Sequence, residues 1–472
     1  MKRILIIGNA PLPTEKSLVR AAAGLRTWQF TKPLSENEDF EVYAVLIGMP
    51  ESYPNGLDEN EFSINENCKI YSIDKNSADL RAKIQKKHDE FKPEVIIGIN
   101  TYPSYIAAGL NSQAKIWCDL NGWIMAEAQA QAHKMDSNDY LAHYFEMEKL
   151  ILKRADKFST VSKAQGQAVI GELACFGRIN KETFGYKFVE PIANATETFE
   201  NENELRLKVE AGNYLKEEEV NILEDSGKFI LLWVGGYNTW VDAETLFFGL
   251  EKAMNECPDL YFISTGGEIK GLDDKTFARF KELINGSKYK DRFVFLGWVD
   301  SEIIPYLYSK ASAGINVDLD CVETKTGARN RINEMMKYGV PVVTTLGSEI
   351  SYEVEESGSG IGVESGSVTG LKEAIVGLYE EWKSGQNMDG RENLSQKYGE
   401  NGKKYIENYS YSKSLEALIK WLEKPEYAPD RGLNIKFSGA AGFKSFLRYF
   451  KENGARKSFK KLFQKLSNLI RG

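Results

Sequence analysis

The stretch Phe229-Ile-Leu-Leu-Trp-Val-Gly-Gly236 decides the fold that we expect for this chain. Six consecutive apolar residues followed by two glycines predict a buried strand that ends in a tight turn. Similar apolar segments follow further along the chain, and longer amphipathic stretches separate them. These further strands are predicted over 260–264, 293–296, 313–317 and 340–344. Buried strands that alternate with helices predict a parallel sheet with helices on both faces.

The N-terminal half follows the same rhythm from its first residues. Ile4–Ile7 runs into Gly8, and this apolar run is too short for a signal peptide, so it is interpreted as a buried first strand. A helix is predicted over 140–155, and further strands over 42–47, 95–99, 115–118 and 158–161. Two such sheets in 472 residues predict two Rossmann-like α/β domains, because one core rarely serves so long a chain.

Changes in composition mark the expected borders between these parts. Residues 196–226 are rich in Glu, Asn and Lys and predict a connection with one charged helix. The expected organisation is an N-terminal Rossmann-like domain over 1–195, an interdomain connection over 196–226, a C-terminal Rossmann-like domain over 227–408, a helix returning toward the N-terminal domain over 409–424, and a basic amphipathic helical tail over 425–472.

The end of the chain carries the opposite charge to the rest. Residues 436–472 hold ten Lys or Arg against one acid, Glu452, for a net charge of +9 in a chain of −8, which leaves −17 on the other 435 residues. Phe and Leu occupy the helix positions opposite these cations, which favours an interfacial helix on an anionic membrane. A helical pair that packs on the protein or on a partner is the alternative. The acidic body argues against nucleic acid as a partner.

The numbers and positions of cysteine and histidine argue against a disulfide-bonded or metal-binding protein. Five scattered cysteines without a Cys-x-x-Cys pair, and three histidines, predict neither a disulfide framework nor a metal site. No apolar run reaches the length of about 20 residues that a membrane-spanning helix needs. These observations predict a cytoplasmic protein that is peripheral at the inner face of the cell membrane through its tail.

Three strands in the C-terminal half end in glycine-bearing turns. Ligands of open α/β sheets bind beyond the carboxyl ends of strands, and glycine lets the backbone approach them closely. Each turn alone is equally well a tight strand–helix connection, and none is a Gly-x-Gly-x-x-Gly dinucleotide fingerprint. Together they predict a ligand site made by Gly235, Gly236, Tyr237 and Asn238, by Thr265, Gly266 and Gly267, and by Trp298 and Val299.

The segment from Glu323 to Glu334 is the densest cluster of charged residues. Lys325, Arg329 and Arg331 provide cations for a diphosphate, and the arginines offer paired N–H groups. Glu334 provides a carboxylate that can accept two sugar or ribose hydroxyls. A solvated helix face with ordinary ion pairs is the alternative, but the position beside a strand end favours a binding site.

These motifs resemble the retaining glycosyltransferases with the GT-B fold, of the family-4 type. The resemblance spans 1–424 and is stronger in the C-terminal half, where Phe295–Val299 matches the base-binding segment and 334–343 matches the end of the Glu–x7–Glu donor motif. It implies two Rossmann-like domains facing each other across a cleft, with a nucleotide-sugar donor on the C-terminal domain and a glycan or lipid-linked acceptor on the N-terminal one. It also implies that Glu334 holds the ribose and that the reaction needs no cofactor or metal.

The sequence departs from the family motif at two places. Thr326 stands where the first glutamate is expected, so Glu323 is the candidate that meets the donor sugar, with Thr326 and Gly327 in the loop that follows it. The Arg–Lys pair expected after the first glycine loop is absent, so Arg329 and Arg331, helped by the nearby lysine, would have to grip the diphosphate.

On the N-terminal side the candidates are fewer. Gly24 and Arg26 lie on the helix after the first strand, near the position of the family's acceptor loop, and Asn121 follows a later strand. Asp119 is the catalytic candidate that would orient the acceptor hydroxyl. An aspartate that caps a turn is an equal alternative.

The expected activity is transfer of a sugar with retention, in the synthesis of cell-envelope polysaccharide or glycoconjugate. Asp318-Leu-Asp320 looks like the metal-binding motif of a different transferase fold and is discounted, because GT-B enzymes hold the diphosphate without metal. Two other interpretations stay open. One is a GT-B-fold epimerase of nucleotide-sugars, against which the scarcity of histidine counts. The other is a degenerate, non-catalytic subunit, which the altered donor motif keeps open.

Overall fold

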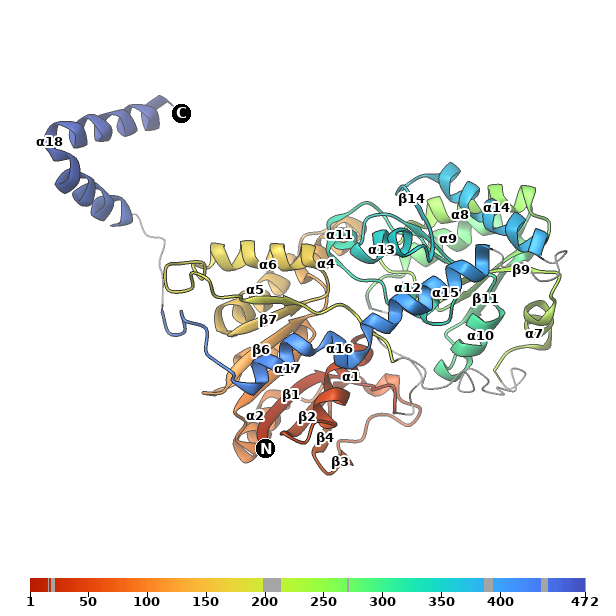
Figure 1. Cartoon of the computed structure of the whole chain (residues 1–472), viewed down its shortest axis with the longest axis horizontal. Coiled ribbons are helices and arrows are strands. Elements are labelled where there is room, and N and C mark those ends of the chain that lie inside the picture. The colour runs from red at the N-terminus through yellow and green to blue at the C-terminus, as the bar shows by residue number, and fades with distance from the viewer. Residues whose placement is uncertain are drawn as a thin grey trace.

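The chain forms two α/β domains joined by two crossings (Figure 1). The structure is a computed structural model that describes residues 1–15, 17, 22–197, 214–269, 271–385, 394–433 and 440–471. The N-terminal domain, in red to yellow, and the C-terminal domain, in green to light blue, each centre on one twisted sheet. The predicted two-domain α/β fold is therefore confirmed.

In the described residues, the N-terminal sheet has eight strands in the order β3-β4-β2-β1-β5-β6-β7-β8. All neighbours pair in parallel except the edge strand β3, which is antiparallel to β4. The strands are β1 Lys2–Asn9, β2 Phe40–Gly48, β3 Glu61–Asn65, β4 Cys68–Asp74, β5 Val95–Ile99, β6 Lys115–Leu120, β7 Lys157–Thr160 and β8 Val189–Pro191. Strands β3, β4 and β8 were not predicted, because none has the continuous apolar run of a central strand. β3 is exposed along its length, β4 alternates apolar with polar residues, and β8 has only three residues.

Helices cover both faces of this sheet. Successive residues of β1 point to opposite sides, so Leu5 and Ile7 join one buried cluster and Ile4 and Ile6 join the other. The helices of the domain are α1 Ala22–Ser35, α2 Leu80–Phe91, α3 Thr101–Gly109, α4 Ile124–Met135, α5 Leu141–Arg154 and α6 Lys163–Cys175, with a short 3-10 turn, η1 Pro50–Ser52.

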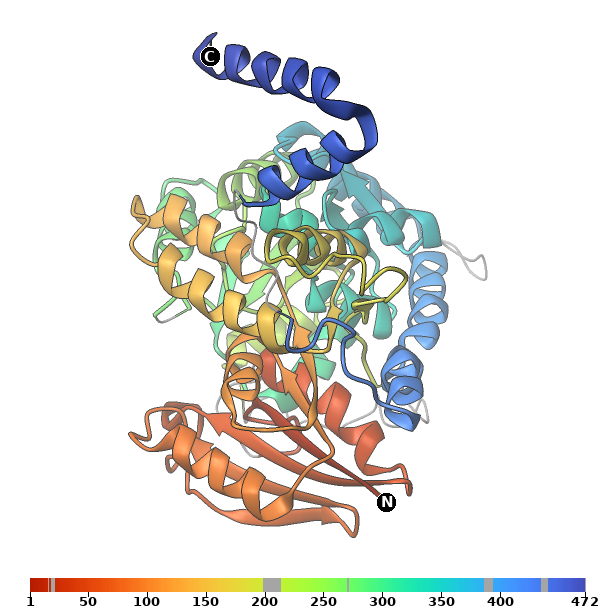
Figure 2. The ribbon, with the colours of Figure 1, turned by 90° about the vertical axis from the view of Figure 1, so that its left-hand side faces the viewer.

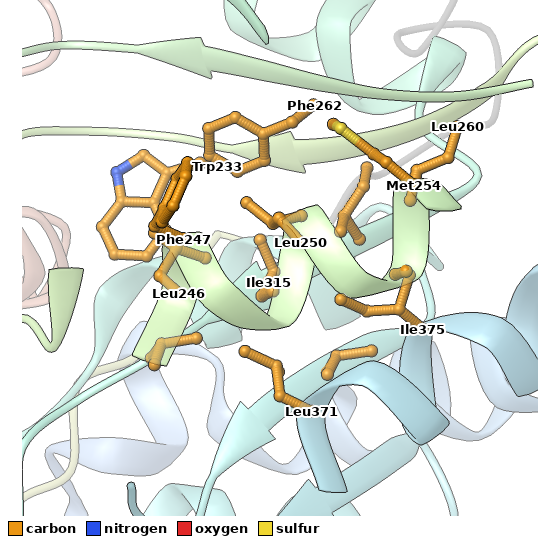
Figure 3. Packing of buried hydrophobic residues seen from close by; sticks show 14 of the residues in the cluster. Trp233, Leu246, Phe247, Leu250, Met254, Leu260, Phe262, Ile315, Leu371 and Ile375 are labelled. Carbon is orange, nitrogen blue, oxygen red and sulfur yellow. The ribbon is translucent and has the colours of Figure 1, made fainter. Parts of the chain in front are cut away.

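The described part of the C-terminal sheet has six parallel strands in the order β11-β10-β9-β12-β13-β14. They are β9 Phe229–Trp233, β10 Leu260–Thr265, β11 Phe293–Gly297, β12 Ala313–Asn316, β13 Val342–Thr345 and β14 Gly360–Val363. The helices are α7 Glu217–Glu224, α8 Ala243–Glu256, α9 Lys275–Asn285, α10 Ile304–Lys310, α11 Val322–Thr326, α12 Asn330–Lys337, α13 Glu349–Ser357 and α14 Val368–Gly385. Figure 3 shows how Leu246 and Leu250 of α8 pack between the strand residues Trp233 and Phe262 and Leu371 of α14.

The chain returns to the N-terminal domain through α15 Leu394–Ile406, η6 Glu407–Tyr409, α16 Tyr411–Ser414 and α17 Glu416–Glu423. α15 packs against α12 of the C-terminal domain. Leu418, Trp421 and Leu422 of α17 join the N-terminal cluster that contains Trp117, whose ring centroid lies 5.3 Å from that of Trp421. The last helices therefore clamp the two domains together.

The tail expected over 425–472 has two structurally different parts. Residues 425–433 lie on the N-terminal domain, where Ala428 N donates to Asp156 Oδ1 at 2.9 Å and Arg431 pairs with Asp156 at 3.1 Å. After them, α18 Ala440–Arg471 bends at Gly454, with φ 74°, and projects away from both domains in two views (Figures 1 and 2). None of the helices in the described ranges has the length and apolar character that crossing a bilayer requires.

Candidate active site

The carboxyl ends of β9, β10 and β11 meet in one tightly packed set of glycine turns. Gly235 N donates to Thr265 Oγ1 at 3.0 Å, and Gly266 N donates to Gly297 O at 2.7 Å. A Cβ on Gly266, which has φ 76°, would lie 2.4 Å from Gly235 O. Any side chain on Gly266 would collide with backbone, so this turn requires glycine. Gly235 and Gly236 stay partly exposed, whereas Gly266 and Gly267 are buried.

Tyr237 supports these turns from below. Its ring is fully buried and stacks on Trp233 with centroids 4.8 Å apart, and its hydroxyl lies 2.7 Å from Ser264 Oγ. Its backbone N donates to Gly267 O at 3.0 Å. Asn238 Oδ1 accepts from Thr239 N at 2.9 Å. Tyr237, expected to bind the donor, is therefore placed as a support of the loop, because no face of its ring reaches solvent.

Arg331, on the first turn of α12, lies directly beneath the glycine turns. Its Nη2 donates to Gly236 O at 3.0 Å, and its guanidinium carbon lies 3.7 Å from the centroid of Trp233. Its Nη1 is buried and has no hydrogen-bond partner in the part of the chain that the structure describes. Burial lowers the pKa of Arg331 to about 10, so the side chain is still a cation at neutral pH. A buried cation with one open donor fits an anionic ligand.

Arg329 does not take the role that the sequence suggested. Its Nε donates to Asp318 Oδ2 at 2.6 Å, and its two terminal nitrogens bind both oxygens of Glu323 at 2.7 and 3.1 Å. All three side chains are almost completely buried. The expectations that Arg329 grips a diphosphate and that Glu323 meets the donor sugar are therefore not met by this geometry, because the two groups neutralise each other. Burial raises the pKa of Glu323, and Arg329 opposes that rise.

The rest of the charged segment also turns away from the glycine turns. Lys325 is exposed and pairs with Asp320 at 2.7 Å. The Thr326 carbonyl accepts from Ser162 Oγ of the N-terminal domain at 2.6 Å, and its hydroxyl donates to Val322 O. Gly327 N donates to Glu323 O at 2.7 Å and ends α11. This segment, expected to bind the donor, is built instead as part of the contact between the domains.

Two further predicted donor residues, Glu334 and Trp298, are partly or largely exposed. Glu334 is on α12 one helical turn after Arg331, and no hydrogen bond or ion pair of its carboxylate is found among the described residues. Trp298 is 51% exposed, and its ring would lie 3.2 Å from a Cβ on Gly236. Val299 packs at the edge of a buried cluster. The exposed indole and the unpaired carboxylate are both available to a ligand on the turns.

On the N-terminal side, Asp119 and Arg26 are paired inside the domain. Two nitrogens of Arg26 bind the Asp119 carboxylate at 2.7 and 3.0 Å, and Ser159 Oγ donates to it at 2.7 Å. Both side chains are almost fully buried. Arg26 also donates to Ile192 O at 2.8 Å, where the chain crosses to the other domain. The expected roles of Asp119 with an acceptor hydroxyl and of Arg26 on the acceptor side do not fit this geometry, because each side chain is buried and bound to the other.

Three asparagines lie side by side at the carboxyl ends of strands β1, β5 and β6 in the N-terminal sheet. Asn121 Nδ2 donates to Asn100 Oδ1 at 2.9 Å, and Asn100 Nδ2 donates to Asn9 Oδ1 at 3.0 Å. Asn100 has φ 72°, a left-handed conformation that is strained for a residue other than glycine. Gly24 sits where a Cβ would lie 1.8 Å from Pro11 O, so it permits α1 to approach the first loop. Asn121 therefore lies just after the carboxyl end of β6, joined to Asn100 by a hydrogen bond, and its expected role on the acceptor side stays a prediction.

Sequence reasoning missed Glu127, on the first turn of α4. Its carboxylate lies against Gly122, where a Cβ would be 2.3 Å from Glu127 Oε1, and α4 packs against α11 of the other domain. Burial, and after it the charge of Glu323 across the interface, raises the pKa of Glu127 to about 8. A perturbed carboxyl between two domains is a candidate functional group. The available signal was its position on a helix that starts directly after a strand end and a glycine turn.

The two domains contact each other beside the second crossing. Asn194 Nδ2 donates to Asn330 Oδ1 at 2.6 Å, and Asn333 Nδ2 donates to Asn194 O at 3.0 Å. Lys163 N donates to Glu349 Oε2 at 2.8 Å. A cavity of about 420 Å³ lies here, lined by both domains and by Tyr405 of α15. Hydrogen bonds therefore join the two domains along this side, around the cavity.

The architecture is shared with solved glycosyltransferase structures. Sucrose-phosphate synthase from Thermosynechococcus elongatus matches with a TM-score of 0.65 at 14% identity, over 90% of this chain and 99% of that one. The Anabaena protein HepE in complex with UDP-glucose matches with a TM-score of 0.59 at 13% identity, over 90% and 100%. WaaG, a glycosyltransferase involved in lipopolysaccharide biosynthesis, matches with a TM-score of 0.57 at 12% identity, over 90% and 100%. These likenesses show that the fold of the chain is GT-B.

The C-terminal domain carries the family signal. Residues 228–381, from the start of β9 into α14, match the family model described as glycosyl transferases group 1. A comparison with curated proteins found no match. The matched segment contains the glycine turns, Trp298, Arg331 and Glu334, so the family signal and the open cation coincide in one domain.

Proposed function

We propose that this chain is a glycosyltransferase that moves a sugar from a nucleotide-sugar donor to a glycan or lipid-linked acceptor with retention. The observation that carries the proposal is the unsatisfied Nη1 of Arg331 beneath the glycine turns, inside the segment that matches glycosyl transferases group 1. A buried cationic donor without a partner costs free energy unless a ligand completes it. A diphosphate supplies the anion that completes it.

The donor would lie across the ends of β9, β10 and β11. Its diphosphate contacts the backbone at Gly235 and Gly236 and the guanidinium of Arg331, which takes the place of the Arg–Lys pair that the sequence lacks. The ribose hydroxyls bind the Glu334 carboxylate, and the base lies beside Trp298. HepE, which shares the fold, is described in complex with UDP-glucose, which supports a nucleotide-sugar as the donor class.

The acceptor would approach from the asparagine edge of the N-terminal domain. The carboxamides of Asn100 and Asn121 suit hydroxyl groups, and Glu127 stands between them and the C-terminal domain. Below its pKa of about 8, Glu127 is a neutral acid that donates a hydrogen bond. The bond from the sugar C1 to the diphosphate breaks, the acceptor oxygen bonds to C1 on the same face, and its proton passes to the leaving diphosphate. Positioning and charge stabilisation then supply most of the catalysis.

The proposal includes transfer without a metal and attachment to a membrane. Asp318 binds Arg329 and Asp320 binds Lys325, so the two aspartates serve separate ion pairs, and we propose transfer without a metal or another cofactor. We also propose cell-envelope synthesis at the inner face of the membrane, with α18 as the anchor. In its described part, Leu447, Phe450, Phe459 and Leu462 are exposed among many cations.

The test is turnover of a panel of nucleotide-sugars, analysed by mass spectrometry with and without magnesium. Sugar transfer, or slow hydrolysis of one donor, supports the proposal. Interconversion of the donor without release of the nucleotide would instead identify a GT-B epimerase. Binding without any turnover would identify a non-catalytic subunit, and activity that appears only on adding magnesium would remove the metal-free mechanism.

A further inference from the structure

The segment 178–187, between α6 and β8, forms a turn that its own hydrogen bonds hold in place. The hydroxyl of the buried Thr183 donates to Arg178 O at 2.7 Å and accepts from Asn180 N at 3.0 Å. Tyr186 N donates to Thr183 O at 3.0 Å. Because the polar groups of the turn bind one another, its outward side chains have fixed positions.

This turn displays two apolar side chains to solvent. Phe184 is 94% exposed, more than any other large hydrophobic side chain described, and Ile179 is 48% exposed. Single exposed apolar residues are common on protein surfaces. A pair held outward on an ordered turn, next to further exposed apolar residues, is instead typical of a contact surface.

The turn borders the place where the tail leaves the body. Arg178, directly before Ile179, binds Asp430 through Nε and Nη2, both at 2.9 Å, and both side chains are buried. Leu433, three residues after Asp430, is 53% exposed. In Figure 1 the yellow loop at the end of α6 lies beside the blue segment that leads to α18. The turn 178–187 and the segment before the tail are therefore held together by this buried ion pair.

Lysines and aromatic rings continue from this element onto α5. The ammonium groups of Lys149 and Lys153 lie 5.7 and 5.6 Å from the ring centroids of Phe145 and Phe176. Lysine stems on aromatic rings, with the charges outward, are typical of a surface that meets lipid headgroups. The charged residues of this face are Lys149, Lys153, Lys181 and Lys187, against Glu146, Glu182 and Glu190. Ion pairs join Lys149 to Glu146, Lys181 to Glu182 and Lys187 to Glu190.

We propose that the turn 178–187, with Phe184 at its tip, is a second membrane contact, which enters the interface of an anionic bilayer beside α18. The charge complementarity comes mainly from the net +9 of residues 436–472, to which this face adds an excess of one lysine over its glutamates. The inference builds on the membrane contact proposed for α18 and does not depend on sugar transfer. Two contacts that share a buried ion pair fix how the N-terminal domain lies on the bilayer, whereas a tail alone would leave it free to swing.

The test is co-sedimentation of the full chain with vesicles of phosphatidylcholine and phosphatidylglycerol. We expect Phe184→Ser to weaken vesicle binding about tenfold, because the ring no longer leaves water. Phe248→Ser is the matched control, since Phe248 is a partly exposed phenylalanine on α8 of the other domain. The same pair of variants is then made in a chain that ends at Leu433, where we expect weaker but measurable binding that Phe184→Ser abolishes.

Each result separates the turn from the tail. Equal binding by Phe184→Ser and by Phe248→Ser in both chain lengths overturns the inference. Loss of binding with Phe184→Ser but not with removal of the tail supports the turn and refutes the anchor role of α18. If Phe184→Ser leaves vesicle binding unchanged but converts a dimer to a monomer in light scattering, the face binds a second copy and the membrane inference is wrong.

Discussion

The two domains present opposite chemistry at the strand ends that face each other. The C-terminal edge is made of glycine backbone beside a buried cation, Arg331, to which no carboxylate of the described residues is bound. The N-terminal edge is made of carboxamides, Asn100 and Asn121, above an ion pair between Arg26 and Asp119 that is neutral as a whole. The same kind of sheet therefore ends once in glycine backbone beside a cation and once in uncharged carboxamides.

The difference between the two edges matches the difference in charge between the two proposed substrates. A nucleotide-sugar carries its charge on the diphosphate, and an uncharged acceptor hydroxyl needs only hydrogen bonds. Glu127 lies between the two edges and stays neutral up to a pH of about 8, so it adds no charge that would repel the diphosphate. The variants below break this contrast at one position at a time.

The largest effect is expected from breaking the neutral pair of the N-terminal edge. Asp119→Asn leaves the buried charge of Arg26 without its partner, and we expect unfolding to become easier by about 3–5 kcal/mol. Urea unfolding followed by tryptophan fluorescence measures this, with Asp320→Asn on the exposed pair as the control, for which we expect no measurable change. An Asp119→Asn protein of normal stability that has lost only acceptor turnover would contradict the structural role.

The next effect is expected at the cation of the C-terminal edge. Arg331→Met removes the open donor, and we expect the Kd for UDP-glucose to rise by about tenfold to a hundredfold, since a charge-assisted hydrogen bond contributes about 1.5–3 kcal/mol. Titration calorimetry measures it, with Lys325→Met as the control cation on the surface. Arg331→Lys keeps the positive charge but loses the paired N–H groups of the guanidinium, so we expect an intermediate Kd. If Arg331→Met leaves the affinity unchanged, Arg331 does not bind the donor and the proposed function loses its main support.

A smaller effect is expected from Glu127, and it depends on pH. Its pKa is raised to about 8, so the side chain donates a hydrogen bond below that pH and loses this ability as the pH rises through it. We expect kcat to fall above about pH 8 in the natural protein. Glu127→Gln, which is neutral at every pH, should lower kcat about tenfold and remove that fall. A pH profile that the substitution does not alter would place Glu127 outside the reaction.

The smallest effect is expected at the asparagine line. Asn121→Ala removes one donor to Asn100 and one carboxamide from the acceptor edge. We expect KM for the acceptor to rise by about threefold with little change for the donor, because one neutral hydrogen bond contributes about 0.5–1.5 kcal/mol. Steady-state kinetics with each substrate varied in turn measures it. A rise in the donor KM alone would mean that the division between the two edges is wrong.

Most of the fold was predictable because central parallel strands are apolar on both faces. The strand predicted over 95–99 is β5 with the same bounds, and the strands that alternate with helices in both halves appear where they were expected. The edge strands β3 and β8 were not predictable in this way, since half-exposed or three-residue strands are stabilised by a neighbour and not by their own sequence pattern.

The candidate site was predictable by region but not by residue. Arg329 and Arg331 stand two positions apart, and a helix that begins between them turns their side chains to different sides. One therefore faces Asp318 and Glu323 and the other faces the glycine turns. Asp119 was equally ambiguous, because a carboxylate at a strand end faces either the cleft or the core, and only the position of Arg26 decides between them.

Helix α6 has a consequence for the length of the acceptor. Its N-cap, Ser162, touches Thr326 of the C-terminal domain, and its other end leads into the turn that carries Phe184. Thirteen residues at a rise of about 1.5 Å make this helix about 20 Å long. If Phe184 rests on the bilayer, α6 holds the domain contact at Ser162 up to about 20 Å from the lipid, and an acceptor hydroxyl between the domains would be at a similar distance. A sugar joined directly to a lipid would then be too low, and an acceptor that already carries several sugar units would reach the right height.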